Sequence, residues 1–223
     1  RGNIMPVYWN PTEIEKRSFA IIAEQLGEKF LQAETPENRE VIQRVIHTTA
    51  DFDYADNLFF SENAVQKGIA ALRRGCTIVT DTEMAKAGIN KTALKRLNGQ
   101  VCCFMSDPEV AEEAKERGVT RAAVSMERAA KLTGPVIFAI GNAPTALLRL
   151  GELVEAGNVT PALIIGVPVG FVNVVESKER ILHSVAGCDV ACIVARGRKG
   201  GSNVAAAVCN ALLYQSVRKE TGN

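Results

Sequence analysis

The chain has 223 residues, of which 26 are basic and 25 acidic, so its formal charge is +1. A nucleic-acid-binding protein normally carries a surplus of basic residues, and this balance argues against that class. No apolar run reaches the roughly 20 residues that span a bilayer, so no membrane segment is expected. An acidic ligand would therefore have to be bound by local basic segments.

The N-terminal third of the chain is predicted to be helical. Thr12 and Glu15 have the spacing of a capping box, with Thr12 as the N-cap of a first helix. A second helix begins at Pro36, a residue that the first helical turn tolerates, and ends near His47. A third helix is predicted over residues 61–75.

From residue 76 onward, short apolar runs alternate with helical stretches. Continuous apolar runs of this kind are typical of parallel strands buried on both faces. We predict a single α/β domain over residues 1–223, a three-layer, doubly wound parallel sheet of about five strands with a helical N-terminal segment. A flavodoxin-like strand order, 2-1-3-4-5, is expected. The predicted strands are 76–80, 100–104, 135–140, 162–167 and 189–195.

The segment after the last predicted strand, residues 196–203, is basic and rich in glycine. Ser202 or Asn203 is expected to cap the helix that follows, and exposed N–H groups at a helix start favour anions. In open parallel sheets, ligands bind beyond the carboxyl ends of the strands, where this segment lies. We therefore predict a site for an acidic small molecule, with cations supplied by Arg196, Arg198 and Lys199.

Other strand-end segments reach the same edge of the sheet. Pro144 stands near a helix start whose N–H groups would hold a carboxylate or phosphate. Gly166 and Gly170 bracket a turn that admits close approach of a ligand. Each loop alone has an equal claim to be simple punctuation between elements. The segments are 81–82, 106–107, 141–145 and 166–171.

Two histidines are candidates for acid–base chemistry. His183 ends an amphipathic helix and is interpreted as a surface residue. His47 also ends a helix, where the carbonyl groups favour the protonated imidazole, so it is a candidate proton donor. Two further positions stay open: Arg17-Ser18 offers either packing or a ligand contact, and Arg121 either a surface charge or a carboxylate clamp.

Motifs of several other classes are missing. The sequence has neither GxxxxGK[ST] nor GxGxxG, and no GxSxG elbow. Asp51, Asp53 and Asp56 lack the glycine and glutamate of a calcium loop, so we interpret them as a solvated acidic turn. The six cysteines lack zinc spacing and mostly lie in apolar runs, which predicts buried thiols, no metal site and a cytoplasmic protein. Residues 1–5 lack a signal core, and Met5 is a candidate start.

Seven segments resemble the precorrin-8X methylmutase family, including its cobalt-precorrin-8 members. They extend over nearly the whole chain in the order of the family, which makes the resemblance more specific than any short fingerprint. The segments are 14–22 (IEKRSFAII), 44–51 (RVIHTTAD), 78–90 (IVTDTEMAKAGIN), 120–122 (TRA), 140–148 (IGNAPTALL), 166–178 (GVPVGFVNVVESK) and 195–205 (ARGRKGGSNVA).

The resemblance implies an isomerase of corrin-ring (cobalamin) biosynthesis. Its reaction moves a methyl group from ring carbon 11 to ring carbon 12 of precorrin-8 or cobalt-precorrin-8 and gives a cobyrinate-type product. The family histidine corresponds to His47, and the resemblance implies a homodimer with its site close to the subunit interface. With the strand-end loops, the candidate substrate-binding residues are Arg17, Ser18, Thr82, Arg121, Asn142, Thr145, Arg196, Arg198 and Lys199.

The implied substrate is an anionic corrinoid whose acetate and propionate arms are ionised near neutral pH. A methyl shift around a conjugated ring requires no redox cofactor, and cobalt, where present, belongs to the substrate. Two other classes remain open. One is a non-catalytic tetrapyrrole carrier; the other is a nucleotide-binding α/β oxidoreductase, against which the missing fingerprint argues.

Overall fold

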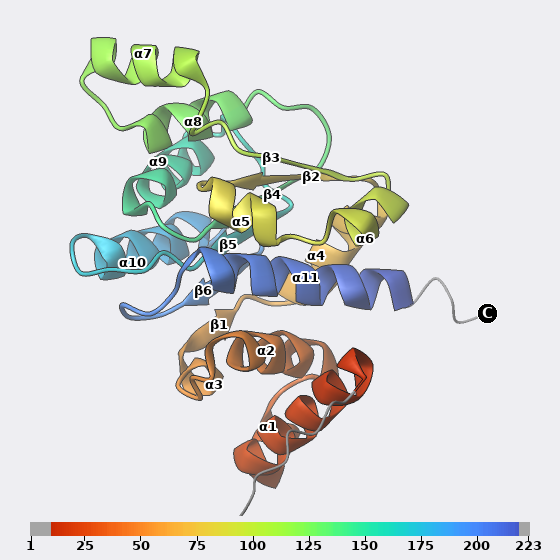
Figure 1. The fold of residues 1–223 in the computed structure, drawn as a ribbon. Coiled ribbons are helices and arrows are strands. Elements are labelled where there is room, and N and C mark those ends of the chain that lie inside the picture. Colours follow the sequence, from red (N-terminus) through yellow and green to blue (C-terminus); the bar gives the residue numbers. More distant parts are fainter. Residues whose placement is uncertain (1–9, 219–223) are drawn as a thin grey trace, which may run out of the picture.

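The computed structural model describes residues 10–218, which form a six-stranded sheet with helices on both faces (Figure 1). The candidate start Met5 lies outside this range. The strand order is β1-β6-β5-β4-β2-β3. The strands are β1 (Leu58–Phe60), β2 (Thr77–Thr80), β3 (Gln100–Cys102), β4 (Val136–Ile140), β5 (Leu163–Gly166) and β6 (Cys192–Ala195). The helices are α1 (Pro11–Ala33), α2 (Pro36–Thr49), α3 (Tyr54–Asn57), α4 (Ala64–Arg73), α5 (Glu83–Gly88), α6 (Lys91–Arg96), α7 (Pro108–Arg117), α8 (Arg121–Ala129), α9 (Pro144–Glu155), α10 (Val174–Val185) and α11 (Ser202–Arg218).

All five predicted strands are present and pair in parallel, β3-β2-β4-β5-β6. Counted along the chain from β2, this is the predicted order 2-1-3-4-5. The prediction lacked β1, which pairs antiparallel with β6 and places Leu58 opposite Ala195. The apolar run at Leu58–Phe60 has only three residues, whereas each predicted run has five or more, which explains the omission.

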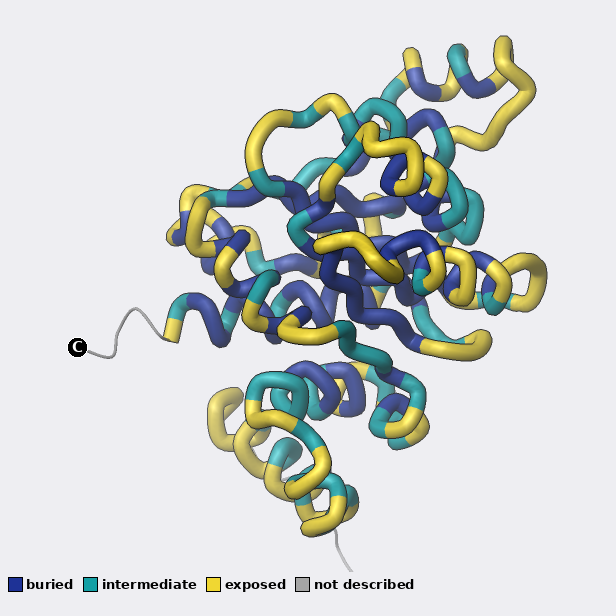
Figure 2. Tube along the Cα trace, turned by 180° about the vertical axis from the view of Figure 1, so that it is seen from behind, coloured by how far each residue is buried: buried dark blue, intermediate teal, exposed yellow. Residues whose placement is uncertain are grey.

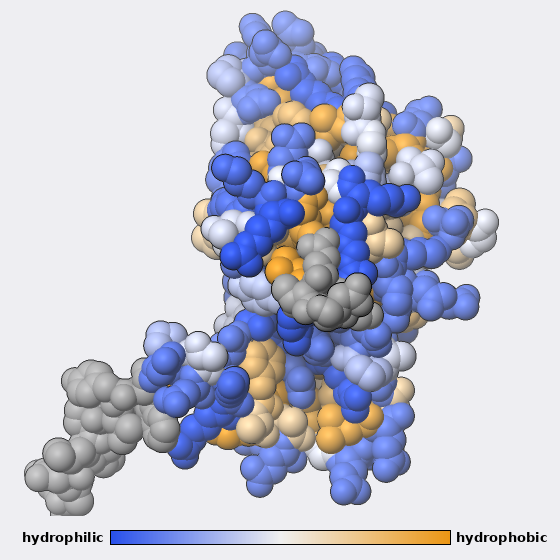
Figure 3. All heavy atoms as spheres, turned by 90° about the vertical axis from the view of Figure 1, so that its right-hand side faces the viewer, coloured by the Kyte–Doolittle hydropathy of each residue, from blue (hydrophilic) through white to orange (hydrophobic). Residues whose placement is uncertain are grey.

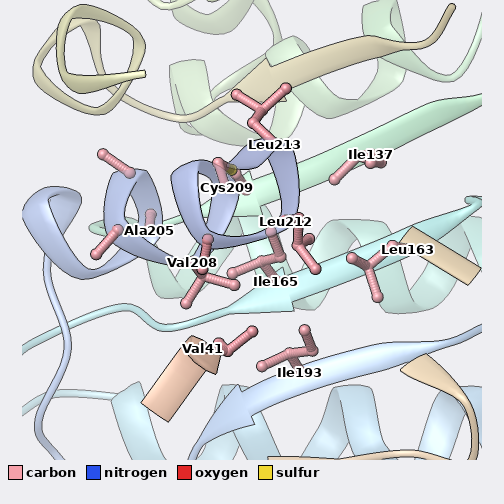
Figure 4. Packing of buried hydrophobic residues seen from close by; sticks show 14 of the residues in the cluster. Val41, Ile137, Leu163, Ile165, Ile193, Ala205, Val208, Cys209, Leu212 and Leu213 are labelled. Atoms are coloured by element: carbon pink, nitrogen blue, oxygen red, sulfur yellow. The ribbon is translucent and has the colours of Figure 1, made fainter. Parts of the chain in front are cut away.

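Two hydrophobic cores lie on the two sides of the sheet because successive strand residues point to opposite faces. On one side Ile137 and Ile165 pack with apolar residues of α2, α4 and α11. On the other side Phe138 and Ile164 pack with residues of α8, α9 and α10. Figure 4 shows Val208 and Leu212 of α11 lying against the strands of the first core. Burial of both faces explains why these strands read as continuous apolar runs.

The N-terminal helices differ in detail from the prediction. The N-cap of α1 is Asn10 rather than Thr12, because the Asn10 side chain accepts the N–H of Thr12 at 3.0 Å. Helix α2 starts at Pro36 as predicted, and it ends where Ala50 adopts φ 54°. The third predicted helix, 61–75, is shorter and corresponds to α4.

Helix α1 lies at the outside of the molecule and packs on α2 (Figure 1). Ile22 is its buried residue, whereas Ile14 and Ile21, seven positions apart and therefore on one face of the helix, are 49% and 47% exposed. Figure 2 shows the same contrast between the largely exposed α1 and the buried sheet. The apolar residues of α1 are therefore only partly buried within this chain.

Hydrophilic residues cover much of the face at the C-terminal end of α11, with apolar residues visible between them (Figure 3). Among residues 10–218, none of the helices combines the length and apolar character that crossing a membrane requires.

Candidate active site

The loops after β2, β4, β5 and β6 meet at the carboxyl edge of the sheet. We call segments 81–82, 141–143, 167–173 and 196–201 the strand-end rim. Gly201 donates its N–H to the carbonyl of Val167 at 2.9 Å, and Gly170 donates to the carbonyl of Arg198 at 3.2 Å. A Cβ atom at Gly200 would lie 2.1 Å from the Val167 oxygen, so this close approach requires glycine.

The loop after β4 is organised by a buried aspartate. The Asp81 carboxylate accepts the backbone N–H groups of Gly141 at 2.8 Å, Asn142 at 2.8 Å and Ala143 at 2.6 Å. The prediction that N–H groups near Pro144 hold a substrate carboxylate is therefore wrong for these three. The chain supplies that carboxylate itself, from a residue 60 or more positions away in sequence.

Burial raises the pKa of Asp81, while the three N–H donors oppose the rise. All three neighbouring groups are donors, so the ionised carboxylate is the form that matches them. Asp81 is fully buried, and its charge therefore serves the loop rather than solvent or a ligand.

The loop after β6 is organised by a buried lysine. Lys178 of α10 is fully buried, and its ammonium donates to the carbonyls of Gly197 at 2.8 Å and Lys199 at 2.9 Å. Burial lowers the pKa of Lys178 from 10.5 to about 8. The backbone of the basic segment is thus held by an ammonium group from the protein interior.

The three predicted cations have different environments. Arg196 and Arg198 are exposed; the guanidinium carbon of Arg196 lies 4.9 Å from the ring centroid of Phe59, and that of Arg198 lies 5.8 Å from that of Phe171. Such contacts with aromatic faces leave the guanidinium edges available for a carboxylate.

Lys199, in contrast, is already paired. Its ammonium lies 2.6 Å from a carboxylate oxygen of Asp51 and 2.6 Å from one of Asp53. The hydrogen bond from Lys199 holds the pKa of Asp51 below its usual value. The Asp51 turn is therefore not only solvated but also paired with Lys199, so this predicted cation already has two carboxylate partners within the chain. Pairing of β1 with β6 brings the two segments together, which local sequence does not reveal.

His47 lies in the last turn of α2, with its side chain exposed. Its ring stacks on Phe19 of α1, with centroids 5.4 Å apart and planes 23° from parallel. Asp51 follows one turn later and binds Lys199, which links the end of α2 to the strand-end rim. The half-buried Ser18 and the exposed Arg17 precede Phe19 directly on α1.

Thr82 has two roles in the structure. Its hydroxyl caps α5 by accepting the N–H of Ala85 at 3.0 Å, and it lies 2.7 Å from the hydroxyl of Ser202. Helix α11 begins at Ser202 itself. The expected cap at Ser202 or Asn203 is therefore wrong, and the Ser202 hydroxyl bridges to the loop after β2.

Arg121, Asn142 and Thr145 form a separate group. Thr120 caps α8 and donates its hydroxyl to that of Thr145 at 3.0 Å, which places the exposed Arg121 beside the start of α9. The exposed Asn142 lies two residues before Pro144, the first residue of α9. The predicted residues thus form a group at α8 and α9, a Thr82–Ser202 bridge, and a group joining the basic segment to His47.

Lys178 is not among the residues predicted for the site. A signal was available, because Val174, Lys178 and Ile181 share one helix face at three- and four-residue spacing and all three are buried. A lysine on an apolar helix face indicates a buried ammonium that needs partners.

Within residues 10–218, no group of three or more His, Cys, Asp or Glu residues is arranged to hold a metal ion. The six cysteines are free thiols.

A family model of precorrin-8X methylmutase matches residues 13–215. The cobalt-precorrin-8 methylmutase of Salmonella typhimurium is 46% identical over 207 residues, which cover 92% of this chain and 95% of the relative. The cobalt-precorrin-8 methylmutase of Priestia megaterium is 43% identical over 212 residues, which cover 95% of this chain and 91% of the relative. The solved structure of precorrin-8x methyl mutase from Thermus thermophilus superposes with a TM-score of 0.81 at 35% identity, covering 92% of this chain and 98% of that one.

The mixed α/β fold and these matches define an enzyme of the isomerase class that shifts a methyl group in corrin biosynthesis. The chain belongs to the precorrin-8X methylmutase family.

Proposed function

We propose that this enzyme moves the methyl group of precorrin-8 or cobalt-precorrin-8 from ring carbon 11 to ring carbon 12, with His47 as the proton donor. The observation that carries the proposal is the position of His47. It is exposed at the end of α2 and is joined to the strand-end rim by the Asp51–Lys199 pair, in a chain that matches the family over residues 13–215.

The reaction is an isomerisation, so the product contains the same atoms as the substrate. The bond from carbon 11 to the methyl group breaks while the bond to carbon 12 forms, and the conjugated double bonds rearrange. An imidazolium at His47 donates to a ring nitrogen and stabilises the rearranged electronic system. The proton returns to the imidazole when the product leaves, and no oxidant or reductant is consumed.

The exposed guanidinium groups of Arg196 and Arg198 hold the ionised acetate and propionate arms of the macrocycle. The backbone N–H groups of the loop after β4 are bound to Asp81. This loop therefore contributes to substrate binding through the exposed side chain of Asn142. Arg17, Ser18, Thr82, Arg121 and Thr145 complete the proposed binding set, and binding of several arms would fix the ring relative to His47.

The test of this proposal is His47→Asn. We expect kcat to fall on the order of 10²–10⁴-fold, because a positioned general acid contributes about this much. The affinity for cobyrinic acid should change little. His183→Asn, which alters the histidine in the last turn of α10, is the matched control and should retain full activity. Full turnover by His47→Asn would remove this residue from the mechanism.

Incubation of the wild-type protein with precorrin-8 and with cobalt-precorrin-8 identifies the substrate. A change in the visible spectrum of one form identifies it as the one converted. Binding without a spectral change would instead indicate a tetrapyrrole carrier. A thermal-shift screen that also contains NAD and FMN tests the nucleotide-binding alternative.

We also propose that the chain works as a homodimer. The exposed Ile14 and Ile21 on α1 support this, since apolar side chains on one helix face are suited to contact with a second subunit. Ile14→Asp combined with Ile21→Asp should shift the sedimentation mass toward that of one chain. An unchanged dimer would place the interface elsewhere.

A further inference from the structure

Lys178 is an unusual residue for a protein interior. Its side chain is fully buried, and among residues 10–218 no carboxylate pairs with it. Burying an ammonium group without an anion costs stability, and here burial alone accounts for the lowered pKa. Its partners are two backbone carbonyls of one short loop, those of Gly197 and Lys199.

These contacts fix the backbone carbonyl groups of the loop within the protein. The carbonyl between them, that of Arg198, accepts the N–H of Gly170 at 3.2 Å. Three successive carbonyl oxygens, at positions 197, 198 and 199, are therefore bound within the protein. The side chains of Arg196 and Arg198 are exposed on the same loop.

We propose that Lys178 is a positioning residue for substrate binding. It turns the carbonyls of Gly197 and Lys199 inward, so that the loop presents guanidinium groups and not oxygen lone pairs to a carboxylate. This inference rests on the proposed function, in which Arg196 and Arg198 hold the arms of the substrate. Without Lys178, outward carbonyls would repel those arms and the two cations would lose their fixed positions.

Lys178→Met tests the proposal, because methionine has a similar length but cannot donate to the carbonyls. We expect KM for the methylmutase reaction and Kd for cobyrinic acid to rise about tenfold, because two charge-assisted hydrogen-bonding groups lose their fixed positions. We expect kcat to change much less, since Lys178 does not touch the reacting atoms. Lys67→Met is the matched control: Lys67 pairs with Asp189 before β6, at the opposite edge of the sheet, and both constants should stay at wild-type values.

Trypsin provides a measurement that does not depend on activity. Arg196, Arg198 and Lys199 are cleavage sites within the loop, and cleavage of a native protein reports local opening. Lys178→Met should be cut there about tenfold faster than the wild type and the Lys67→Met control, with urea unfolding recorded to separate local from global opening.

The proposal would be overturned if the Lys178→Met variant folds and its KM, Kd and cleavage rate equal those of the wild type. Faster cleavage with unchanged KM and Kd would overturn the role in binding. If wild-type protein itself fails to bind cobyrinic acid, the proposed function fails, while the cleavage rates still report on the loop. If Lys178→Met does not fold, Lys178→Arg, which keeps the charge but displaces the loop, should raise KM, and an unchanged KM would refute the proposal.

Discussion

The loops after β4 and β6 lie at the same edge of the sheet but are held by buried charges of opposite sign. Asp81 binds three N–H groups of the β4 loop, and Lys178 binds two carbonyls of the β6 loop. The first arrangement uses up the donors that would attract an anion. The second uses up the acceptors that would repel one.

This comparison separates two features that look alike in sequence. Both loops precede a helix, and both were predicted to bind carboxylates through helix-start N–H groups. In the loop after β4, the buried Asp81 carboxylate instead accepts the N–H groups. The loop after β6, which Lys178 holds, exposes Arg196 and Arg198. The sign of the buried charge therefore determines which of the two loops keeps groups that can bind an anion exposed to solvent.

The largest expected effect is on the Asp81 loop. Asp81→Asn keeps the shape of the side chain but directs an amide N–H group at backbone donors. We expect the free energy of unfolding at pH 7 to fall by about 3 kcal/mol in urea denaturation. Asp107→Asn is the matched control, because Asp107 precedes α7 without a side-chain capping bond, and its effect should stay within about 0.5 kcal/mol. Equal losses in both variants would contradict the role given to Asp81.

The next effect concerns the pH dependence of the Lys178 loop. The pKa of Lys178 is lowered from 10.5 to about 8 in the folded protein, so the folded state binds fewer protons between these values. Its contribution to stability is complete above 10.5 and disappears as the pH falls through about 8. The stability of wild type relative to Lys178→Met should therefore increase by about 2 kcal/mol from pH 7 to pH 10. Urea denaturation of both proteins at the two pH values measures this, and a constant difference would show that the ammonium is not buried as described.

The smallest expected effect is at the surface of the same loop. Arg198→Ala should weaken cobyrinic acid binding about fivefold at low ionic strength, because it removes one of two exposed cations. The difference in Kd between Arg198→Ala and wild type should shrink as the salt concentration rises from about 50 mM to about 500 mM, since ions screen exposed charges. Arg198→Lys keeps the charge and should stay close to wild type. A loss that is independent of salt would assign Arg198 to packing on Phe171 instead.

The sequence was sufficient to place the five parallel strands and their order. Strands β2, β4, β5 and β6 are buried along their whole length, whereas β3 lies at the edge of the sheet and is partly exposed. Each strand lies in an apolar run bounded by turn residues, so the pattern is local. The exposed cations Arg196 and Arg198 were predicted for the same reason, since a basic glycine-rich segment after a strand is also a local signal.

Features that depend on distant segments could not be predicted in this way. The pairing of Lys199 with Asp51 spans 148 positions, and the bond from Gly141 to Asp81 spans 60. Local spacing carries no information about either contact. The three residues of β1, which bring the Asp51 turn beside the basic segment, show no periodicity of their own.

The register of strand β1 on β6 also sets the position of the Asp51 turn relative to the basic segment. Its register sets Leu58 opposite Ala195, and each residue of a strand advances about 3.3 Å. One residue inserted within β1 would therefore either slide the acidic turn by one position relative to Lys199 or invert the side chains of β1 across the sheet. The three paired residues of β1 thus fix where the Asp51 turn lies beside the basic segment.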